Sequence, residues 1–123
     1  MSEIDCLFVY GTLKQGHYNF RVVEKLVGRV SRGWRVRGTL FDMGGYPGLV
    51  LDGGGEVRGE LLESGQMSEL LRITDEIEGD EYERVEVTAG SEDGVRRRTW
   101  TYRYLGDTGS LRRLAGEEWL GSL

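Results

Sequence analysis

Two short segments contain the groups that are best suited to bind a ligand or take part in a reaction. Residues 10–16 read Tyr-Gly-Thr-Leu-Lys-Gln-Gly and follow directly on an apolar run, residues 6–10. Backbone N–H groups that become free where such a strand ends can bind a carboxylate or an oxyanion, and Gly11 permits the close approach and the unusual backbone dihedrals that such a turn requires. Residues 75–79 place carboxylates at the end of a helical pattern. Taken alone, Glu78 in this second segment is typical of a solvated acid at a helix end, so it specifies no reaction by itself.

Composition excludes most other kinds of reactive site. The chain of 123 residues contains one His and one Cys, which is too few for a metal site built from those ligands. A Ser-His-Asp arrangement would need His17, which lies in a polar loop and is expected to be exposed. Cys6 begins an apolar run and is expected to be buried filler. The glycine-rich segments match neither the Walker A pattern nor the dinucleotide fingerprint, so no bound phosphate is indicated.

The charge balance bears on partners and location. A net charge of −5 and a pI near 5.0 argue against a nucleic-acid partner, which needs a surplus of Lys and Arg. Arg96, Arg97 and Arg98 run together, but Glu92 and Asp93 precede them, so a solvated strand edge is the preferred interpretation. No long apolar run or signal-type N-terminus occurs, and we expect a cytoplasmic protein without a membrane partner. The oligomeric state is not indicated.

Hydrophobic spacing predicts two main helices. The first covers residues 19–27, with Asn19 as N-cap and Gly28 as the stop. The second covers residues 67–78, with Ser68 as N-cap and Gly79 as terminator. A further helical turn is expected around Leu111 and Leu114.

Alternating or short apolar runs separated by glycines predict the strands. They fall at residues 6–10, 34–41, 49–51, 57–61, 82–87 and 99–105. Read as an element order, the chain gives strand, helix, three strands, helix and two strands in a single domain, 1–123. This is an α+β arrangement, and its glycine corners predict a mostly antiparallel sheet that curls toward a barrel.

The pattern as a whole resembles the gamma-glutamylcyclotransferase-like family. The resemblance rests on Val-Tyr-Gly-Thr-Leu-Lys near the N-terminus, the Tyr46-Pro47 step, Asp-x-x-Glu-Gly at residues 75–79, and Tyr-x-Arg at residues 82–84. It extends over residues 6 to about 105 and is closest to the gamma-glutamylamine cyclotransferases and the small bacterial branch. The segment Gly-Glu-Glu-Trp at residues 116–119 is similar to the Gly-Asp-Trp ending of that branch.

This resemblance implies a small mixed β-barrel carrying two helices, and a pocket between the first loop and the second helix. It implies that Glu78 is the catalytic acid/base and that a substrate-binding loop holds the γ-glutamyl head through its backbone groups. The residues that match this loop are Tyr10, Gly11, Thr12 and Leu13, and Tyr82 matches an aromatic residue of the same pocket. Tyr46 and Pro47 either form a pocket wall or only a turn. No metal or cofactor is implied.

The implied reaction suits this inventory of residues. The α-amine of a γ-glutamyl amide can attack its own γ-carbonyl, which releases the free amine and 5-oxoproline without a protein nucleophile. One carboxylate can accept and return the proton, but an ordinary Glu is about 3.5 pKa units too acidic for an amine near 8. Burial and the negative end of a helix would both raise the pKa of Glu78. Its rival, Glu76, lies about 200° round the helix, off the face of Leu71 and Thr74.

Two other functions stay open at this point. A family member without activity could bind a small carboxylate ligand in the same pocket, and an interaction domain could use the aromatic face of Trp100, Tyr102 and Tyr104. Arg84 is expected to pair with Glu86 or Glu60 across strands rather than to hold substrate. Asp75 is expected to make a helix-end or strand-capping contact. The sequence does not name the leaving amine.

Overall fold

The fold is organised around β1 (Cys6–Val9), whose four residues are all buried. The structure, a computed structural model, describes residues 4–114 and 118–120. Phe8 on β1 packs with Trp34 in the cluster that fills the barrel, while Leu7 and Val9 pack in a second cluster against the helices. Because both faces of β1 are covered, nearly every position in it must be apolar. This confirms the prediction of a strand buried on both faces.

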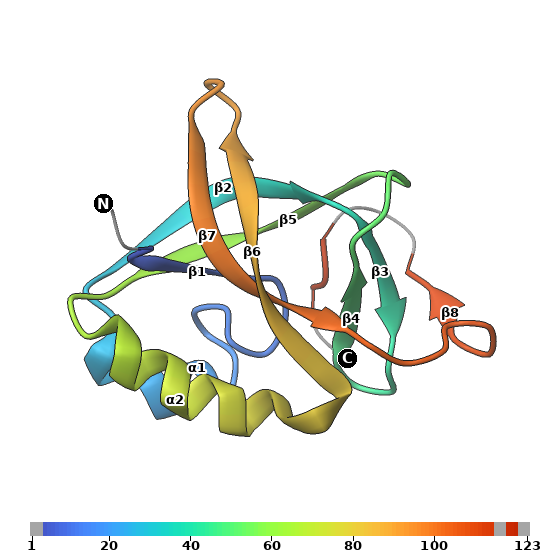
Figure 1. Ribbon diagram of the computed structural model, residues 1–123, viewed down its shortest axis with the longest axis horizontal. Coiled ribbons are helices and arrows are strands. Elements are labelled where there is room, and N and C mark those ends of the chain that lie inside the picture. The colour runs from blue at the N-terminus through green and yellow to red at the C-terminus, as the bar shows by residue number, and fades with distance from the viewer. Residues whose placement is uncertain (1–3, 115–117, 121–123) are drawn as a thin grey trace.

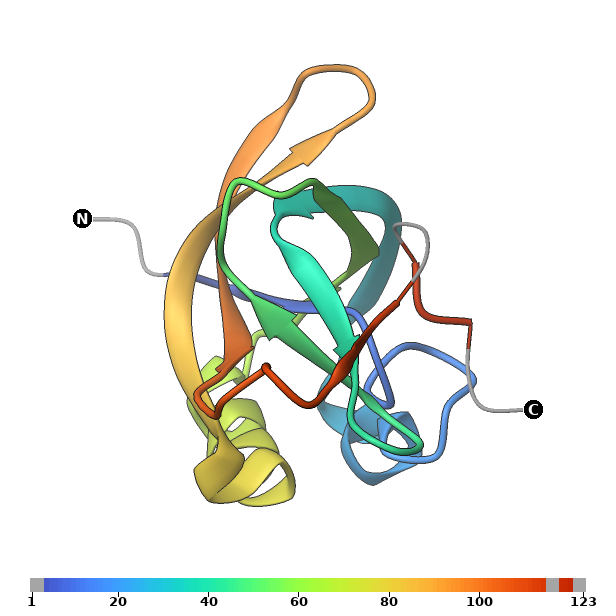
Figure 2. The ribbon, with the colours of Figure 1, turned by 90° about the vertical axis from the view of Figure 1, so that its right-hand side faces the viewer.

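Five strands close into a barrel in the order β1-β5-β2-β6-β7, and a three-stranded sheet, β4-β3-β8, lies beside it (Figures 1 and 2). All strand pairs are antiparallel except β1 with β7, which is parallel. The α+β class and the mixed, mostly antiparallel barrel are therefore confirmed. The other elements are α1 (Phe20–Val23), η1 (Glu24–Leu26), β2 (Arg29–Arg37), β3 (Thr39–Asp42), β4 (Pro47–Val50), β5 (Glu56–Glu63), α2 (Met67–Glu78), η2 (Gly79–Glu81), β6 (Tyr82–Ser91), β7 (Arg96–Tyr104) and β8 (Arg112–Arg113).

The element order differs from the predicted one in two places. Four strands, not three, lie between α1 and α2, because β3 and β4 form a hairpin outside the barrel. The helical turn predicted around Leu111 and Leu114 was wrong. There, Arg112 and Arg113 pair with β3, and the N–H of Leu114 donates to the carbonyl oxygen of Leu40 at 2.9 Å. The open edge of β3 offers this segment hydrogen bonds that an isolated turn could not supply.

The two helices pack side by side against one side of the barrel (Figure 1). The first is shorter than predicted, and Asn19 makes no capping hydrogen bond. Its side chain instead donates from Nδ2 to Oγ1 of Thr12 at 2.8 Å. Ser68 lies inside α2 and is not its N-cap. Gly79 ends α2 with φ of +70°, a value that favours glycine, as predicted.

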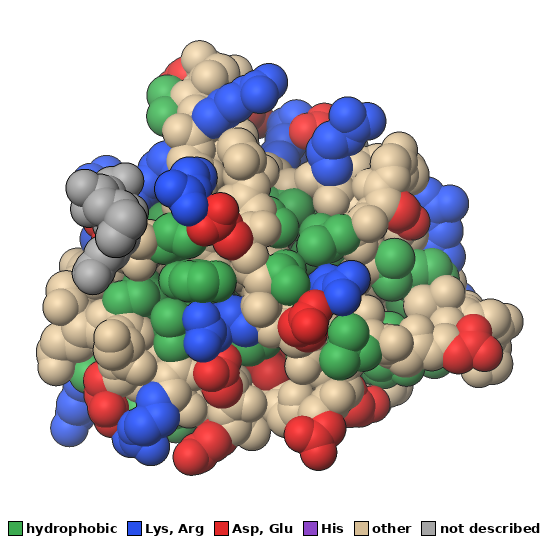
Figure 3. All heavy atoms as spheres, viewed as in Figure 1, with side chains coloured by type: hydrophobic (Ala, Val, Ile, Leu, Met, Phe, Trp, Pro, Cys, Tyr) green, Lys and Arg blue, Asp and Glu red, His purple; other side chains and the backbone are tan. Residues whose placement is uncertain are grey.

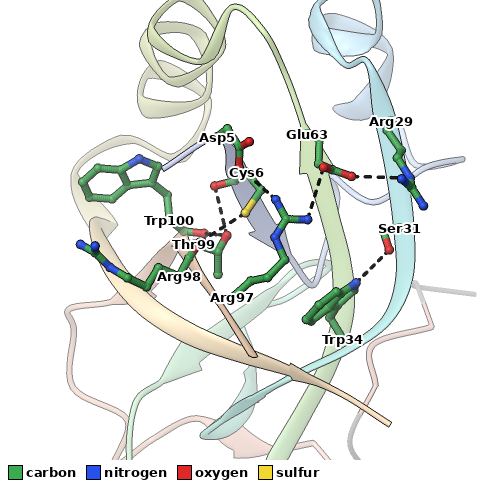
Figure 4. A network of polar contacts seen from close by, with 10 residues as sticks. All are labelled: Asp5, Cys6, Arg29, Ser31, Trp34, Glu63, Arg97, Arg98, Thr99 and Trp100. Carbon is green, nitrogen blue, oxygen red and sulfur yellow. Dashed lines mark hydrogen bonds and ion pairs between the residues drawn. The ribbon is translucent and has the colours of Figure 1, made fainter. Parts of the chain in front are cut away.

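Polar contacts hold the seam between β1 and β7, as Figure 4 shows. The hydroxyl of Thr99 donates to the carbonyl oxygen of Cys6 at 3.1 Å. The guanidinium of Arg97 lies 2.9 Å from a carboxylate oxygen of Asp5 and 3.3 Å from one of Glu63. Arg97 therefore joins β7 to the residue before β1 and to β5. Cys6 is fully buried, as expected.

Lys14 holds the segment around Trp119 against the barrel. The Lys14 side chain is 7% exposed, and its Nζ donates to the carbonyl oxygen of Trp119 at 2.7 Å and lies 3.6 Å from Glu118. The Trp119 ring packs into the barrel cluster, and its centroid lies 5.0 Å from that of His17. His17 is thus half-buried rather than exposed. Burial and the nearby charge of Lys14 lower its pKa.

Lys14→Met is expected to lower the free energy of unfolding by about 1–3 kcal/mol, because the buried carbonyl of Trp119 loses its donor. Urea unfolding of the variant measures this loss. Lys25→Met is the matched control, since Lys25 is the one other lysine and is exposed. Equal unfolding midpoints for the two variants would contradict a stabilising role for the Lys14 contact.

Within the described residues, no helix is long and apolar enough to cross a membrane.

Candidate functional site

A pocket opens where β1 ends, between the loop that follows it and the end of α2. Its inner compartment has a volume of about 30 Å³. It brings together every site residue predicted from the sequence. These are Tyr10, Gly11, Thr12, Leu13, Tyr46, Pro47, Glu78 and Tyr82. Segments far apart in the chain thus meet at one place, and Tyr46 and Pro47 are walls of the pocket as well as part of the turn between β3 and β4.

Glu78 is the carboxylate of this compartment. Burial raises the pKa of Glu78 from its ordinary 4.5 to about 7. The sequence interpretation invoked the helix end as well, but burial alone accounts for this shift. Glu76, the rival carboxylate, points away from the pocket, is 76% exposed and lies 3.8 Å from Arg72. The predicted difference between the two acids, based on the helical face of Leu71 and Thr74, is confirmed.

The loop after β1 lines the pocket and contains backbone donors that are not used within the described part of the fold. Carbonyl oxygens of this loop accept hydrogen bonds, Gly11 from the N–H of Lys14 at 3.0 Å and Thr12 from the N–H of Asn19 at 3.1 Å. In contrast, the N–H groups of Gly11, Thr12 and Leu13 have no acceptor among residues 4–114 and 118–120. Successive free N–H groups favour an anion. The backbone around Gly11 is therefore suited to hold a carboxylate or a developing oxyanion.

Gly11 is required by close approach and not by an unusual backbone angle. A Cβ atom at this position would lie 2.8 Å from Cδ and Cγ of Pro47, and the φ of Gly11 is not positive. The absence of a side chain lets the β3–β4 turn close over the loop. Gly11 is therefore needed for the close approach that the sequence predicted, and not for unusual backbone dihedrals.

Four tyrosines line the inner compartment, and their hydroxyl groups bind backbone or neighbouring side chains: Tyr10, Tyr46, Tyr82 and Tyr102. Tyr10 donates to the carbonyl oxygen of Tyr102 at 2.7 Å and accepts from the N–H of Leu49 at 3.3 Å. Tyr82 donates to the carbonyl oxygen of Pro47 at 2.8 Å. Burial, followed by the charge of Glu78, raises the pKa of both Tyr10 and Tyr82. These tyrosines stay neutral and shape the pocket with their rings.

The position of α2 is fixed by a network on the β7 side. The hydroxyl of Tyr102, another residue of the inner compartment, donates to a carboxylate oxygen of Asp75 at 2.5 Å and lies 2.7 Å from the hydroxyl of Thr74. Arg84 donates to both carboxylate oxygens of Asp75 and lies over the ring of Trp100 at 4.7 Å. Burial raises the pKa of Asp75, but the hydrogen bonds from Arg84 and Tyr102 outweigh it and lower the pKa overall.

This network corrects the expectation for Arg84 and bears on the alternative of an aromatic interaction face. Arg84 pairs with Asp75 on α2 and not with Glu86 or Glu60, because the end of the helix lies over β6 and offers a closer carboxylate. Trp100, Tyr102 and Tyr104 pack against the helices in the second core cluster and do not form a free interaction face. Arg98 pairs with Glu86 instead. The basic run is therefore neutralised at Arg97 and Arg98.

Beyond Glu78 the site widens into an outer compartment of about 250 Å³. Four residues line both compartments, Thr12, Tyr46, Glu78 and Tyr82. The outer one is completed by Tyr18, Asn19, Ile77 and Glu81. Two of these lining residues are joined, because the hydroxyl of Tyr46 donates to Oε1 of Glu81 at 3.1 Å. The two compartments therefore form one continuous site, with Glu78 at their boundary.

Sequence reasoning missed Tyr102 and three residues of the outer compartment, Tyr18, Asn19 and Glu81. Tyr102 was visible only as one member of an alternating aromatic strand, a pattern that core residues share. Tyr18 and Asn19 lie in a loop of undefined shape, and Glu81 is one of several acids after α2. In the described parts of the chain, no three His, Cys, Asp or Glu side chains are grouped so that they could hold a metal.

Comparison with known proteins gives the site a context. A γ-glutamyl cyclotransferase of Niallia circulans, named for gamma-L-glutamyl-butirosin B, is 37% identical over 107 residues. The match covers 80% of this chain and 65% of that protein, less than two thirds of its length.

Two solved structures share the fold. An AIG2-like protein from Mus musculus has a TM-score of 0.71 and 25% identity, over 96% of this chain and 89% of that one. YkqA from Bacillus subtilis has a TM-score of 0.70 and 21% identity, over 95% of this chain but 40% of that one. At this identity YkqA supports the fold alone.

The sequence profile described as Gamma-glutamyl cyclotransferase, AIG2-like, matches residues 7–121, nearly the whole chain. The match includes β1 and its loop, α2 with Glu78, and β6 with Tyr82. On that evidence the chain belongs to the AIG2-like γ-glutamyl cyclotransferase family.

Proposed function

We propose that this protein cyclises a γ-glutamyl amide to 5-oxoproline and releases the free amine, with Glu78 as general acid and base. The observation that carries the proposal is the meeting of a desolvated carboxyl at Glu78 with the free N–H groups of residues 11–13 in one pocket. The name of the Niallia circulans relative supports the reaction class.

In the first step, the nitrogen of the substrate α-amine attacks its own γ-carbonyl carbon, and Glu78 accepts the proton that the nitrogen loses. The carbonyl oxygen becomes an oxyanion, which the N–H groups of the loop stabilise. A pKa of about 7 for Glu78 narrows the gap to an amine near 8 to about one unit, or about 1.4 kcal/mol. An ordinary Glu would face a gap of about 5 kcal/mol.

In the second step, the bond between the γ-carbon and the leaving nitrogen breaks. Glu78 returns its proton to that nitrogen, so the amine leaves neutral and the carboxylate is restored. No water enters the reaction, and the walls of Tyr10 and Tyr82 help to exclude it. Binding of the γ-glutamyl group between the loop and Glu78 supplies the proximity that ring closure needs.

The test offers purified protein a panel of γ-glutamyl amines and measures 5-oxoproline and free amine by mass spectrometry. We expect equal amounts of the two products, and no product from N-acetylated substrates, because acetylation removes the nucleophile. Glutamate in place of 5-oxoproline would instead indicate hydrolysis by water. Ligand binding by calorimetry without any product would favour the alternative, a binding protein for a small carboxylate ligand.

A further inference from the structure

The outer compartment determines what can be attached to the γ-glutamyl group. The inner compartment, at about 30 Å³, accepts only part of a γ-glutamyl group. Glu78 lines both compartments, so a leaving group beside its carboxyl extends into the outer compartment of about 250 Å³. The chemistry of that lining then decides which leaving amines fit.

The lining is negative. It contains the carboxylates of Glu78 and Glu81 and neither Lys nor Arg. On the face shown in Figure 3, Asp and Glu side chains gather along the lower edge, over α2 and the turn after it. Most of the acids around Glu81 are neutralised, since Asp75 pairs with Arg84, Glu76 with Arg72 and Glu83 with Arg103.

Glu81 differs from these neighbours. Its side chain has no ion pair among the described residues, and the carboxylate accepts a single hydrogen bond, at Oε1, from the Tyr46 hydroxyl. The charge that faces the outer compartment is therefore not compensated by the protein. The rings of Tyr18, Tyr46 and Tyr82 complete the surroundings. Aromatic rings beside an uncompensated carboxylate favour an organic cation.

We propose that the outer compartment selects leaving amines that carry a second positive charge, with Glu81 as the specificity-determining residue. This inference rests on the proposed cyclisation. Glu81 follows Glu78 by three residues, past the bend at Gly79, and both carboxylates line the outer compartment, so one diamine can lie beside both of them. Leaving groups that carry a carboxylate, such as free amino acids, are disfavoured by the same charge.

Three γ-glutamyl amides with equal chain length test this inference. Their leaving groups are putrescine, pentylamine and the matching ω-amino acid, which end in an ammonium, a methyl group and a carboxylate. We expect kcat/KM to fall in that order, with putrescine about fivefold above pentylamine. The advantage is expected to shrink as salt is added, because it is electrostatic.

Glu81→Gln is expected to bring the ratio of putrescine to pentylamine close to one, since Gln can still accept the hydrogen bond of Tyr46 but carries no charge. Glu83→Gln is the matched control. Glu83 lies outside the pocket, and the ratio is expected to persist in that variant.

Equal kcat/KM for putrescine and pentylamine in the wild type would overturn the inference, and so would a ratio that survives in Glu81→Gln. Either result leaves the cyclisation standing. Failure of all three amides to give 5-oxoproline would overturn the proposed function, and the inference with it.

Discussion

Replacing Glu78 with Gln is expected to lower kcat for ring formation by about 10²- to 10⁴-fold, the usual contribution of a general acid–base group. Gln has nearly the same shape as a protonated Glu and keeps the pocket filled. It cannot accept a proton from the attacking amine or return one to the leaving amine. The measurement is the rate of 5-oxoproline release at saturating substrate, followed by mass spectrometry.

Glu76→Gln is the matched control, because Glu76 lies on the same helix but is exposed and points away from the pocket. It is expected to retain the wild-type rate. In the wild type, kcat/KM is expected to rise with pH through an apparent pKa of about 7. In Glu78→Gln this limb should be replaced by the titration of the substrate amine alone, near 8. Ring formation that survives the Glu78 substitution would refute its role as the base while leaving the reaction in place.

The same substitution is expected to stabilise the protein at alkaline pH. The pKa of Glu78 is raised from 4.5 to about 7 in the folded state, so the folded protein binds the proton more tightly than the unfolded chain does. Stability from this group is fully present below about pH 4.5 and is lost as pH rises to about 7. Gln cannot ionise, so the variant does not lose this stability as the pH rises.

We therefore expect the advantage of Glu78→Gln over the wild type to be about 2–3 kcal/mol larger at about pH 8 than at about pH 5. Urea unfolding at the two pH values measures the difference. Glu76→Gln should show no comparable change with pH. An advantage for Glu78→Gln that is the same at both pH values would mean that its carboxyl is not desolvated in the folded protein.

Local patterns in the sequence predicted the elements well where packing agrees with local preference. The apolar run of β1 is explained by burial on both faces, and the stop at Gly79 by a positive φ. The residues predicted for the pocket do line it. The family pattern identified them, and hydrophobic periodicity did not. Glu78 and Glu76 could be separated from the sequence because helical geometry places them on different faces.

What could not be predicted depends on contacts between distant segments. The strand β8 forms because the edge of β3 is open. The side chain of Asn19 makes no capping hydrogen bond because it donates to Thr12 instead. Arg84 was assigned to strand partners because the sequence does not show that the end of α2 lies over β6. Glu81 looked like any solvated acid until the outer compartment showed that it lacks a cationic partner among the described residues.

The seam between β1 and β7 has a consequence for the order of events during synthesis. The hydroxyl of Tyr10 reaches the carbonyl oxygen of Tyr102, 92 residues later, and Leu7 pairs with Trp100. A ribosome therefore releases the loop after β1 long before the strand that completes its pocket. Contacts of such long separation close slowly. The nascent chain must carry an apolar first strand without its partner, which makes that strand the segment most in need of a chaperone.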